Sequence, residues 1–275
     1  MPAPSCSLIV STYNRPAALR RCAQSIIAQT VLPDEIIIAD DGSDEETRLL
    51  IQSIQQKTNI PFLHAWQPHE GYQLAKIRNK AFVASGKEYL IQVDGDLILH
   101  PNFIKDHISM ARHGIFVSGS RLNMDENLTE NVIAGNIPFE DISKNRNNLS
   151  KKYNGWYSPL LCQMNYLIQR GNDNYKHVLG CNMAFWKKDL EEVNGYNENF
   201  KGWGKEDNDL AVRLINAGLQ LRFVKYGAIC YHMAHEIAGF SMTMGNEKLL
   251  KKSIKEKITF TPFGMKKTHV NAHEA

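Results

Sequence analysis

Residues 6–16 read CSLIVSTYNRP, and this stretch decides the fold class. Residues 6–11 form a short apolar run bounded by turn formers, which predicts a buried strand. Pro16 suits the first turn of a helix, and apolar residues recur at helical spacing over residues 17–29. The chain therefore opens with a strand that is followed directly by a helix.

The alternation of strands and helices continues through most of the chain. Further strands are predicted at residues 35–39, 62–66, 88–93, 115–118, 178–185, 221–224 and 229–232. Further helices are predicted to end at Ile54 and to cover residues 73–84 and 206–217. This pattern predicts an α/β fold with a twisted, mostly parallel sheet flanked by helices. Such sheets bind ligands at the carboxyl ends of their strands, so we expect the site there.

Residues 123–176 lack a clear periodicity and are rich in Asn, Ser and Lys, with aromatic residues at Trp156 and Tyr157. A long irregular segment in a compact domain is usually functional or mobile. We interpret it as loops beside the substrate or as a small helical insertion. A plain disordered loop is the alternative.

The composition is that of an ordinary globular protein. The chain has 275 residues, 43% of them hydrophobic and 22% charged. This length allows one large domain or two small ones, and we favour a single unit. A net charge of +3 without a basic tract that carries aromatic residues gives no indication of a nucleic-acid partner. Five scattered cysteines without a CxxC pair argue against a zinc site or a disulfide framework and favour a reducing compartment. The first apolar run is too short for a signal peptide, so we expect a cytoplasmic protein.

Polar side chains follow the first two predicted strands. Ser11 and Tyr13 come after the first strand, and Asp41 comes after the second. Tyr13 could stack on a nucleotide base while a carboxylate accepts an imide proton, a pairing that suits uracil. Ordinary turn and N-cap chemistry is the alternative explanation.

A candidate cation site follows the strand at residues 88–93. Asp94 and Asp96 flank Gly95, which lets the backbone approach closely, and carboxylates suit Mg²⁺ or Mn²⁺. A simple turn is the alternative. His232 and His235 close the last predicted strand, and an imidazole ligand shifts the preference toward Mn²⁺. His232 is our first choice as a ligand and His235 is its rival, since both reach one ion only if the strand has already turned.

Two further motifs are candidates for chemistry. Glu206 and Asp207 fall in the first turn of a predicted helix, where Asp207 could take a proton from a substrate hydroxyl. Trp203, between two glycines, could support a sugar ring. Arg78, near the start of another helix, could meet phosphates. A capped helix start, a tight turn and a surface salt bridge are the respective alternatives.

Taken together, five motifs resemble glycosyltransferase family 2, whose members have the GT-A fold. They are SLIVSTYNRP, IIIADDGSDEET, GYQLAKIRN, LIQVDGDLIL and FKGWGKEDNDLAVRL, and the resemblance covers residues 5–236. The last motif and the histidines after it also resemble the catalytic half of galactosyltransferases, N-acetylgalactosaminyltransferases and the bacterial chondroitin polymerase. The departures are DGD for DAD or DVD, WGKED for WGGED, and two histidines where one ligand suffices.

The resemblance implies a role for each motif. It places Ser11, Tyr13 and Asp41 toward uracil, Arg78 and Asp94 toward donor phosphate or ribose, and Gly95 and Trp203 in the donor site. It places Asp96 and a histidine on Mn²⁺ or Mg²⁺, and it makes Asp207, with Glu206 beside it, the catalytic pair. The implied activity is an inverting hexosyl transfer from a UDP-sugar to a hydroxyl of a saccharide or glycolipid, in bacterial surface polysaccharide synthesis. Gal, GalNAc and GlcNAc are the candidate sugars.

On this basis residues 1–120 would form the nucleotide-sugar half, residues 121–245 the acceptor half of the same domain, and residues 246–275 a basic tail. The tail motif EKLLKKSIKEKI, at residues 247–258, suits peripheral contact at the inner face of the membrane, although a helix packed on the protein is favoured. A non-catalytic carbohydrate-binding protein and a nucleotidyltransferase are the rival classes. The second would need a glycine-rich basic loop after the first strand, and an oxidoreductase would need GxGxxG there.

Overall fold

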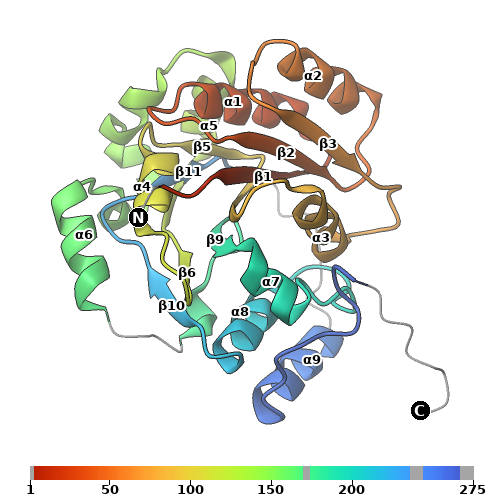
Figure 1. Ribbon diagram of the computed structural model, residues 1–275. Coiled ribbons are helices and arrows are strands. Elements are labelled where there is room, and N and C mark those ends of the chain that lie inside the picture. The colour runs from red at the N-terminus through yellow and green to blue at the C-terminus, as the bar shows by residue number, and fades with distance from the viewer. Residues whose placement is uncertain (1–2, 170–173, 236–243, 267–275) are drawn as a thin grey trace.

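The computed structural model of the protein describes residues 3–169, 174–235 and 244–266. Its main sheet has seven strands: β1 Cys6–Thr12, β2 Glu35–Asp40, β3 Phe62–Trp66, β4 Tyr89–Asp94, β6 Ile115–Ser118, β9 Asn182–Trp186 and β10 Gln220–Phe223. Their order is β10-β6-β9-β4-β1-β2-β3 (Figure 1). Every residue of β1 and β2 is buried, because helices cover both faces of the sheet.

The sheet is mostly parallel, as the sequence predicts. β1 pairs in parallel with β2 and β4, β2 with β3, and β6 with β10. β9 is antiparallel to both of its neighbours, β4 and β6. The strand predicted over residues 178–185 therefore begins later, at Asn182, and runs against the rest.

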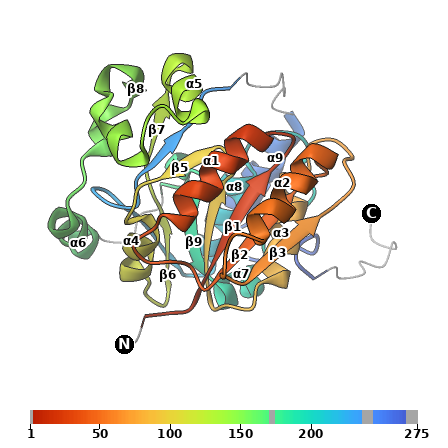
Figure 2. The same ribbon diagram turned by 90° about the horizontal axis from the view of Figure 1, so that it is seen from above.

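Helices lie on both faces of this sheet (Figures 1 and 2). Their bounds are α1 Pro16–Ile27, α2 Glu45–Gln55, α3 Leu74–Ala84, α4 Phe103–Met110, α7 Lys187–Val193 and α8 Glu206–Asn216. α1, α2 and α4 share one apolar core with the sheet, and α3, α7 and α8 share the other. Local signals explain the helix starts: Pro16 opens α1, and the Asp44 side chain caps α2 by accepting from the Thr47 amide at 3.1 Å.

A second, smaller sheet lies beside the first. It contains β5 Leu97–Leu99, β7 Arg121–Met124, β8 Leu149–Ser150 and β11 Cys230–His232 in the order β5-β11-β7-β8. β5 follows β4 after the turn at Gly95 and Asp96, and β11 pairs antiparallel with β5 so that His232 faces Leu97. The second sheet thus brings His232 to the carboxyl end of β4.

The segment predicted to be irregular is a helical insertion, which confirms one of the two expected forms. It contains α5 Glu126–Ala134, α6 Pro159–Ile168 and the 3₁₀ turns η1 Phe139–Lys144, η2 Arg146–Asn148, η3 Lys152–Gly155 and η4 Tyr175–His177. Side-chain caps open both helices, from Asp125 for α5 and Ser158 for α6.

The C-terminal helix α9, Met244–Lys255, packs on the protein, as favoured from the sequence. Leu250 is buried against Phe200 and Val212 of the neighbouring elements. The Ser253 hydroxyl donates to Asp209 at 2.6 Å. Residues 267–275 of the predicted tail lie outside the described residues. Within the described ranges, no helix is both long enough and apolar enough to cross a bilayer.

Candidate active site

The carboxyl ends of β1 and β4 lie side by side and form the centre of the site. Ser11 faces Asp94 in the parallel register, and the amide of Gly95 donates to the Ser11 carbonyl at 2.7 Å. A Cβ atom at Gly95 would lie 3.0 Å from that carbonyl oxygen. The glycine therefore allows the turn after β4 to sit tightly against β1, which directs the carboxylates of Asp94 and Asp96 to the sheet edge.

Asp96, His232 and His235 form a cluster with the composition of a metal site. The Nε2 atoms of His232 and His235 lie 3.5 and 3.4 Å from Asp96 Oδ2. The two rings are 5.2 Å apart, so the chain has turned after β11 enough to bring both imidazoles to one point. The structure thus brings together all three predicted ligands, and both histidines face the carboxylate.

The charges around Asp96 fit a cation. Its Oδ1 atom is buried and has no hydrogen-bond partner among the described residues. Burial opposes ionisation of Asp96, but His232, Arg15 and His235 outweigh it, so the pKa of this carboxyl is below its usual value. A carboxylate with an open oxygen beside two imidazoles is a donor set that Mn²⁺ accepts.

Arg15 contacts the same carboxylate. Its Nη1 atom lies 2.6 Å from Asp96 Oδ2, and its side chain is 30% exposed. Arg15 sits just before α1, so the loop after β1 supplies a positive charge at the rim of the cluster. A divalent cation bound at Asp96 Oδ2 would have to share this oxygen with Arg15 or displace the guanidinium.

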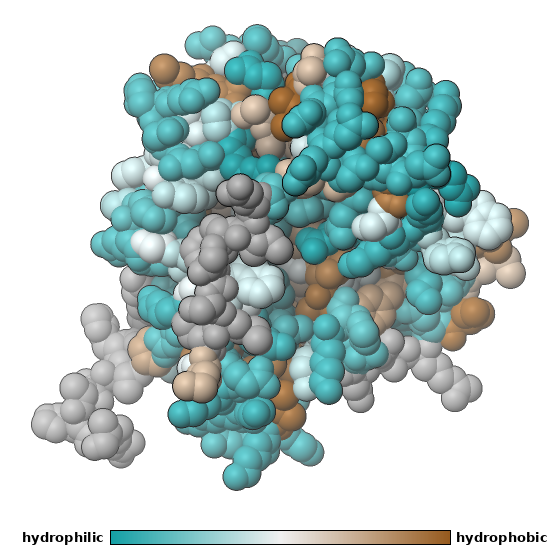
Figure 3. Space-filling view, turned by 180° about the vertical axis from the view of Figure 1, so that it is seen from behind, coloured by the Kyte–Doolittle hydropathy of each residue, from teal (hydrophilic) through white to brown (hydrophobic). Residues whose placement is uncertain are grey.

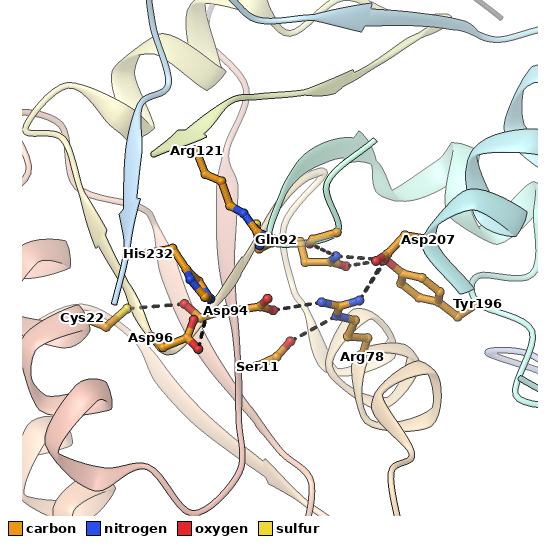
Figure 4. A network of polar contacts seen from close by, with 12 residues as sticks. Ser11, Cys22, Arg78, Gln92, Asp94, Asp96, Arg121, Tyr196, Asp207 and His232 are labelled. Atoms are coloured by element: carbon orange, nitrogen blue, oxygen red, sulfur yellow. Dashed lines mark hydrogen bonds and ion pairs between the residues drawn. The ribbon is translucent and has the colours of Figure 1, made fainter. Parts of the chain in front are cut away.

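A buried arginine joins the two halves of the site (Figure 4). Arg78 of α3 is 1% exposed and donates to Asp94 and to Asp207, both at 2.9 Å. Its Nε atom donates to the Ser11 hydroxyl at 3.2 Å. Arg78 was expected near donor phosphate; in this structure its guanidinium holds two carboxylates from distant segments.

Asp207 is held in one orientation by several groups. The Tyr196 hydroxyl donates to Asp207 Oδ1 at 2.7 Å and accepts from Gln92 Nε2 at 2.9 Å. A Cβ atom at Gly180 would collide with the Asp207 carboxylate, so this glycine makes room for it. Asp207 therefore lies at the first turn of α8, and Arg78 of α3, Tyr196 and the chain that enters β9 determine the direction of its carboxylate.

Glu206, its neighbour, is buried, and the positive charge of Arg78 compensates only part of the cost of that burial. The side chain is 4% exposed, and its Oε2 atom has no hydrogen-bond partner within the described ranges. Burial, followed by the charge of Asp207, raises the pKa of Glu206 to about 7. This carboxyl changes its charge near neutral pH.

Tyr13, after β1, and His69, after β3, form an aromatic platform. The exposed ring of Tyr13 stacks on His69, with ring centroids 4.4 Å apart. Gly42 permits the contact, because it has φ +90° and a Cβ atom there would collide with the His69 backbone. Asp41 lies behind the platform and accepts from Gln67 at 2.6 Å and from the Gln73 amide at 2.9 Å. Its two oxygens thus hold the loop that carries His69.

Trp203 stands on a loop before α8 with half of its surface exposed. The loop turns through Gly202, Gly204 and Lys205, which all have positive φ. Asn246 of α9 holds this loop, because its side-chain amide donates to the carbonyls of residues 201 and 204 at 3.1 and 2.9 Å.

The sequence matches two family models. Residues 7–193 match the model described as glycosyl transferase family 2. The chain belongs to glycosyl transferase family 2. Residues 165–236 also match the model described as the N-terminal domain of galactosyltransferase, and this range includes Asp207, His232 and His235.

The curated relatives include two chondroitin synthases and a validoxylamine A glucosyltransferase. The chondroitin synthase of Escherichia coli is 27% identical over 82% of this chain and 34% of its own length. The chondroitin synthase of Pasteurella multocida is 26% identical over 92% of this chain and 27% of its own. The validoxylamine A glucosyltransferase of Streptomyces hygroscopicus subsp. limoneus is 23% identical over 90% of this chain and 57% of its own length. The chain therefore spans about a third or less of the length of the chondroitin synthases.

Solved structures show the GT-A fold. GalNAc-T7, determined with UDP, GalNAc and Mn²⁺, has a TM-score of 0.67 at 16% identity over 92% of this chain and 48% of its own. The mannosyltransferase PcManGT from Pyrobaculum calidifontis, determined with GDP-Man and Mn²⁺, has a TM-score of 0.59 at 14% identity over 92% of this chain and 70% of its own. The predicted fold and family are confirmed.

Several residues of this family 2 site escaped the sequence analysis. Arg15, His69, Gly180 and Tyr196 contact predicted site residues, and Gln92 contacts Tyr196. Arg15 stands inside the quoted STYNRP motif, so its position next to a strand end was the available signal. Gly180 and Tyr196 carry no local signal, because only the packing of β9 and α7 against α8 brings them to Asp207.

Proposed function

We propose that this family 2 protein transfers a hexose from a UDP-sugar to a hydroxyl group of a saccharide or glycolipid acceptor, with inversion at the anomeric carbon and with a divalent ion, Mn²⁺ or Mg²⁺. Gal, GalNAc and GlcNAc are the candidate sugars, and bacterial surface polysaccharide synthesis is the candidate setting. The chondroitin synthase relatives support the setting, and GalNAc-T7, determined with UDP, supports the nucleotide.

One observation carries the proposal. A three-ligand cluster and a candidate base lie at the same sheet edge and are connected through Asp94 and Arg78. Sugar binding alone does not require Asp96, with an unpartnered oxygen, beside two histidines. It also does not require the fixed carboxylate of Asp207 next to Glu206, whose pKa is raised. The arrangement therefore favours a transferase over the rival classes.

On the donor side, each of the following residues would have its own role. Asp96, His232 and His235 hold the ion, which neutralises charge on the departing diphosphate when it is bound. Arg15, at the rim, reaches the diphosphate as a second cation. The exposed Tyr13 ring stacks on the nucleotide base.

The acceptor side would lie toward α8. Asp207 takes the proton of the attacking hydroxyl, and Trp203 supports the acceptor sugar from the adjacent loop. A hydroxyl that attacks opposite the leaving diphosphate inverts the anomeric carbon, so an α-linked donor gives a β-linked product. No covalent intermediate with the protein is needed.

The decisive experiment is calorimetric titration of the protein with UDP-, GDP- and CDP-sugars in Mn²⁺ and then in EDTA. The proposal predicts binding of UDP-sugars that is strong in Mn²⁺ and lost in EDTA. Preference for a GDP-sugar, as in the ligand of PcManGT, would overturn the UDP assignment. Binding of free saccharides without any nucleotide would instead support a carbohydrate-binding protein.

A further inference from the structure

The helix α6 presents an apolar face to solvent. Leu160, Met164, Leu167 and Ile168 are 68%, 53%, 66% and 76% exposed. Their spacing of i, i+4, i+7 and i+8 places them on one side of the helix. In Figure 3 brown side chains mark the edge of the molecule where α6 lies, since this view is Figure 1 turned through 180°. A continuous apolar stripe of this kind marks an interaction surface.

The opposite side of α6 is already used for packing. Cys162 and Tyr166 are buried there, and the Tyr166 hydroxyl donates to the Met110 carbonyl at 2.6 Å. α6 therefore has a defined orientation on α4, at the edge of the molecule (Figures 1 and 2). The exposed stripe is a consequence of that orientation and not of fraying.

Two exposed aromatic side chains lie in the segment just before α6. Tyr153 and Trp156 are 94% and 70% exposed. They line a pocket of about 270 Å³, together with the basic side chains of Arg146 and Lys152. Exposed aromatic rings beside an apolar helix are typical of surfaces that lie in the headgroup region of a bilayer.

Basic residues lie on the segments around α6, whereas α6 itself has no charged residue. Arg222 packs over the Tyr166 ring on the packed side of α6, with its guanidinium carbon 4.7 Å from the ring centroid. Lys225 is exposed next to Tyr226, whose ring contacts Trp156, and Lys151 is exposed just before η3. On the neighbouring elements, the carboxylate of Asp106 is buried and Asp141 is paired with Lys144, whereas Glu140 is exposed.

These observations indicate what kind of partner the stripe binds. We propose that α6, with Tyr153 and Trp156, docks the protein onto an anionic phospholipid bilayer. The apolar stripe enters the boundary between headgroups and acyl chains, and the flanking cations attract the lipid charge. A second copy on the same face would bring the cations of both copies together, which disfavours it. This surface is separate from α9, whose Leu250 is buried against the protein.

The test is flotation of the full chain, without nucleotide, with vesicles of phosphatidylcholine alone or mixed with phosphatidylglycerol. The protein is expected to bind the mixed vesicles and to leave them as salt rises. The double variant Leu167→Glu and Ile168→Glu should lose at least about tenfold in binding. Trp156→Phe should abolish the blue shift of tryptophan fluorescence that accompanies binding.

A matched control keeps the outcome specific. Leu49→Glu with Val83→Glu adds the same charge at apolar residues of α2 and α3 that are 53% and 54% exposed, and it should bind like the unchanged protein. Equal losses in both double variants, equal binding to neutral vesicles, or no binding to any vesicle would overturn the proposal. So would a doubled mass in light scattering that the α6 variant abolishes. Mn²⁺-dependent nucleotide binding, measured on each variant, shows that the fold is intact and keeps this test separate from the proposed activity.

Discussion

Single residues in this site act through partners that are far away in sequence. Arg78 is almost fully buried, yet it has both Nη groups on carboxylates and its Nε on Ser11. A buried charge is tolerated only when it is paired and hydrogen-bonded, so the arginine and the carboxylates of Asp94 and Asp207 hold one another in place.

Asp207→Asn tests the base. The amide keeps the shape of the side chain but cannot take a proton, so turnover should fall by about 10²- to 10⁴-fold while donor binding persists. Transfer rate and calorimetric donor affinity would be measured together. Asp44→Asn, which changes a carboxylate at the start of α2 and keeps its capping ability, is the control. Full turnover in Asp207→Asn would remove Asp207 from this role.

Arg15→Gln tests the competition for Asp96. Removing the guanidinium should raise the Mn²⁺ affinity of the nucleotide-free protein by up to about fivefold, in line with the ~1 kcal/mol of a partly exposed ion pair. It should weaken the binding of the UDP-sugar, because a cation at the diphosphate is lost. Manganese titration by electron paramagnetic resonance measures the first effect. The exposed Arg20 on the same helix, changed to Gln, should leave both affinities unaltered.

Glu206→Gln tests the raised pKa of this carboxyl. Because that pKa rises from 4.5 to about 7 on folding, the native state binds more protons than the unfolded state between these values. The free energy of unfolding of the unchanged protein should therefore fall, relative to the variant, as pH rises through this window. Urea unfolding of both proteins would be measured at about pH 5 and about pH 8. At the higher pH the free energy of unfolding of the variant should exceed that of the unchanged protein by up to a few kcal/mol. Parallel pH profiles would contradict the shift.

At the scale of elements, α9 is a support for the loop before α8. The side-chain amide of Asn246 donates to the carbonyls of residues 201 and 204. Glu247 of α9 forms an ion pair with Lys205, the residue just before α8. The positive φ values of Gly202 and Gly204 show that the loop needs glycine to follow this path. The helix α9, which lies in the segment predicted as a tail, thus determines the position of the loop that carries Trp203.

Asn246→Ala should loosen this loop. Two hydrogen bonds are lost, at a cost of about 1–2 kcal/mol, so the KM for the acceptor should rise several-fold while Mn²⁺-dependent donor binding stays the same. Steady-state kinetics with each substrate varied in turn would separate the two effects. Lys251→Ala, 72% exposed on the same helix, is the control. A loss confined to donor affinity would move the loop to the donor side.

At the scale of the whole molecule, the site lies at the junction of two sheets. Asp96 follows a strand of the main sheet, whereas His232 ends a strand of the second sheet and His235 follows it. An ion held by all three would connect segments that are otherwise joined through packing and hydrogen bonds. Metal binding and global stability should therefore be linked.

Manganese should raise the Tm of the protein. A ligand that binds only the native state adds about 2.7 kcal/mol at a concentration of 100 Kd. Thermal unfolding in Mn²⁺ and in EDTA would show the shift, and Asp96→Ala should abolish it. Glu45→Ala, at an exposed ion pair of α2, should keep it. An unchanged shift in Asp96→Ala would place the ion elsewhere.

Local patterns were sufficient for the order of elements and for most of the candidate site. Apolar runs, N-caps and helical spacing act within a few residues, so β1 to β4 and their helices could be predicted, with Asp94, Asp96 and Tyr13 at the strand ends. The direction of β9, the second sheet, the choice of Arg78 as the partner of Asp207 and the exposed side of α6 could not. Each depends on contacts between segments far apart in the chain, and such contacts exist only once the sheets and helices have packed together.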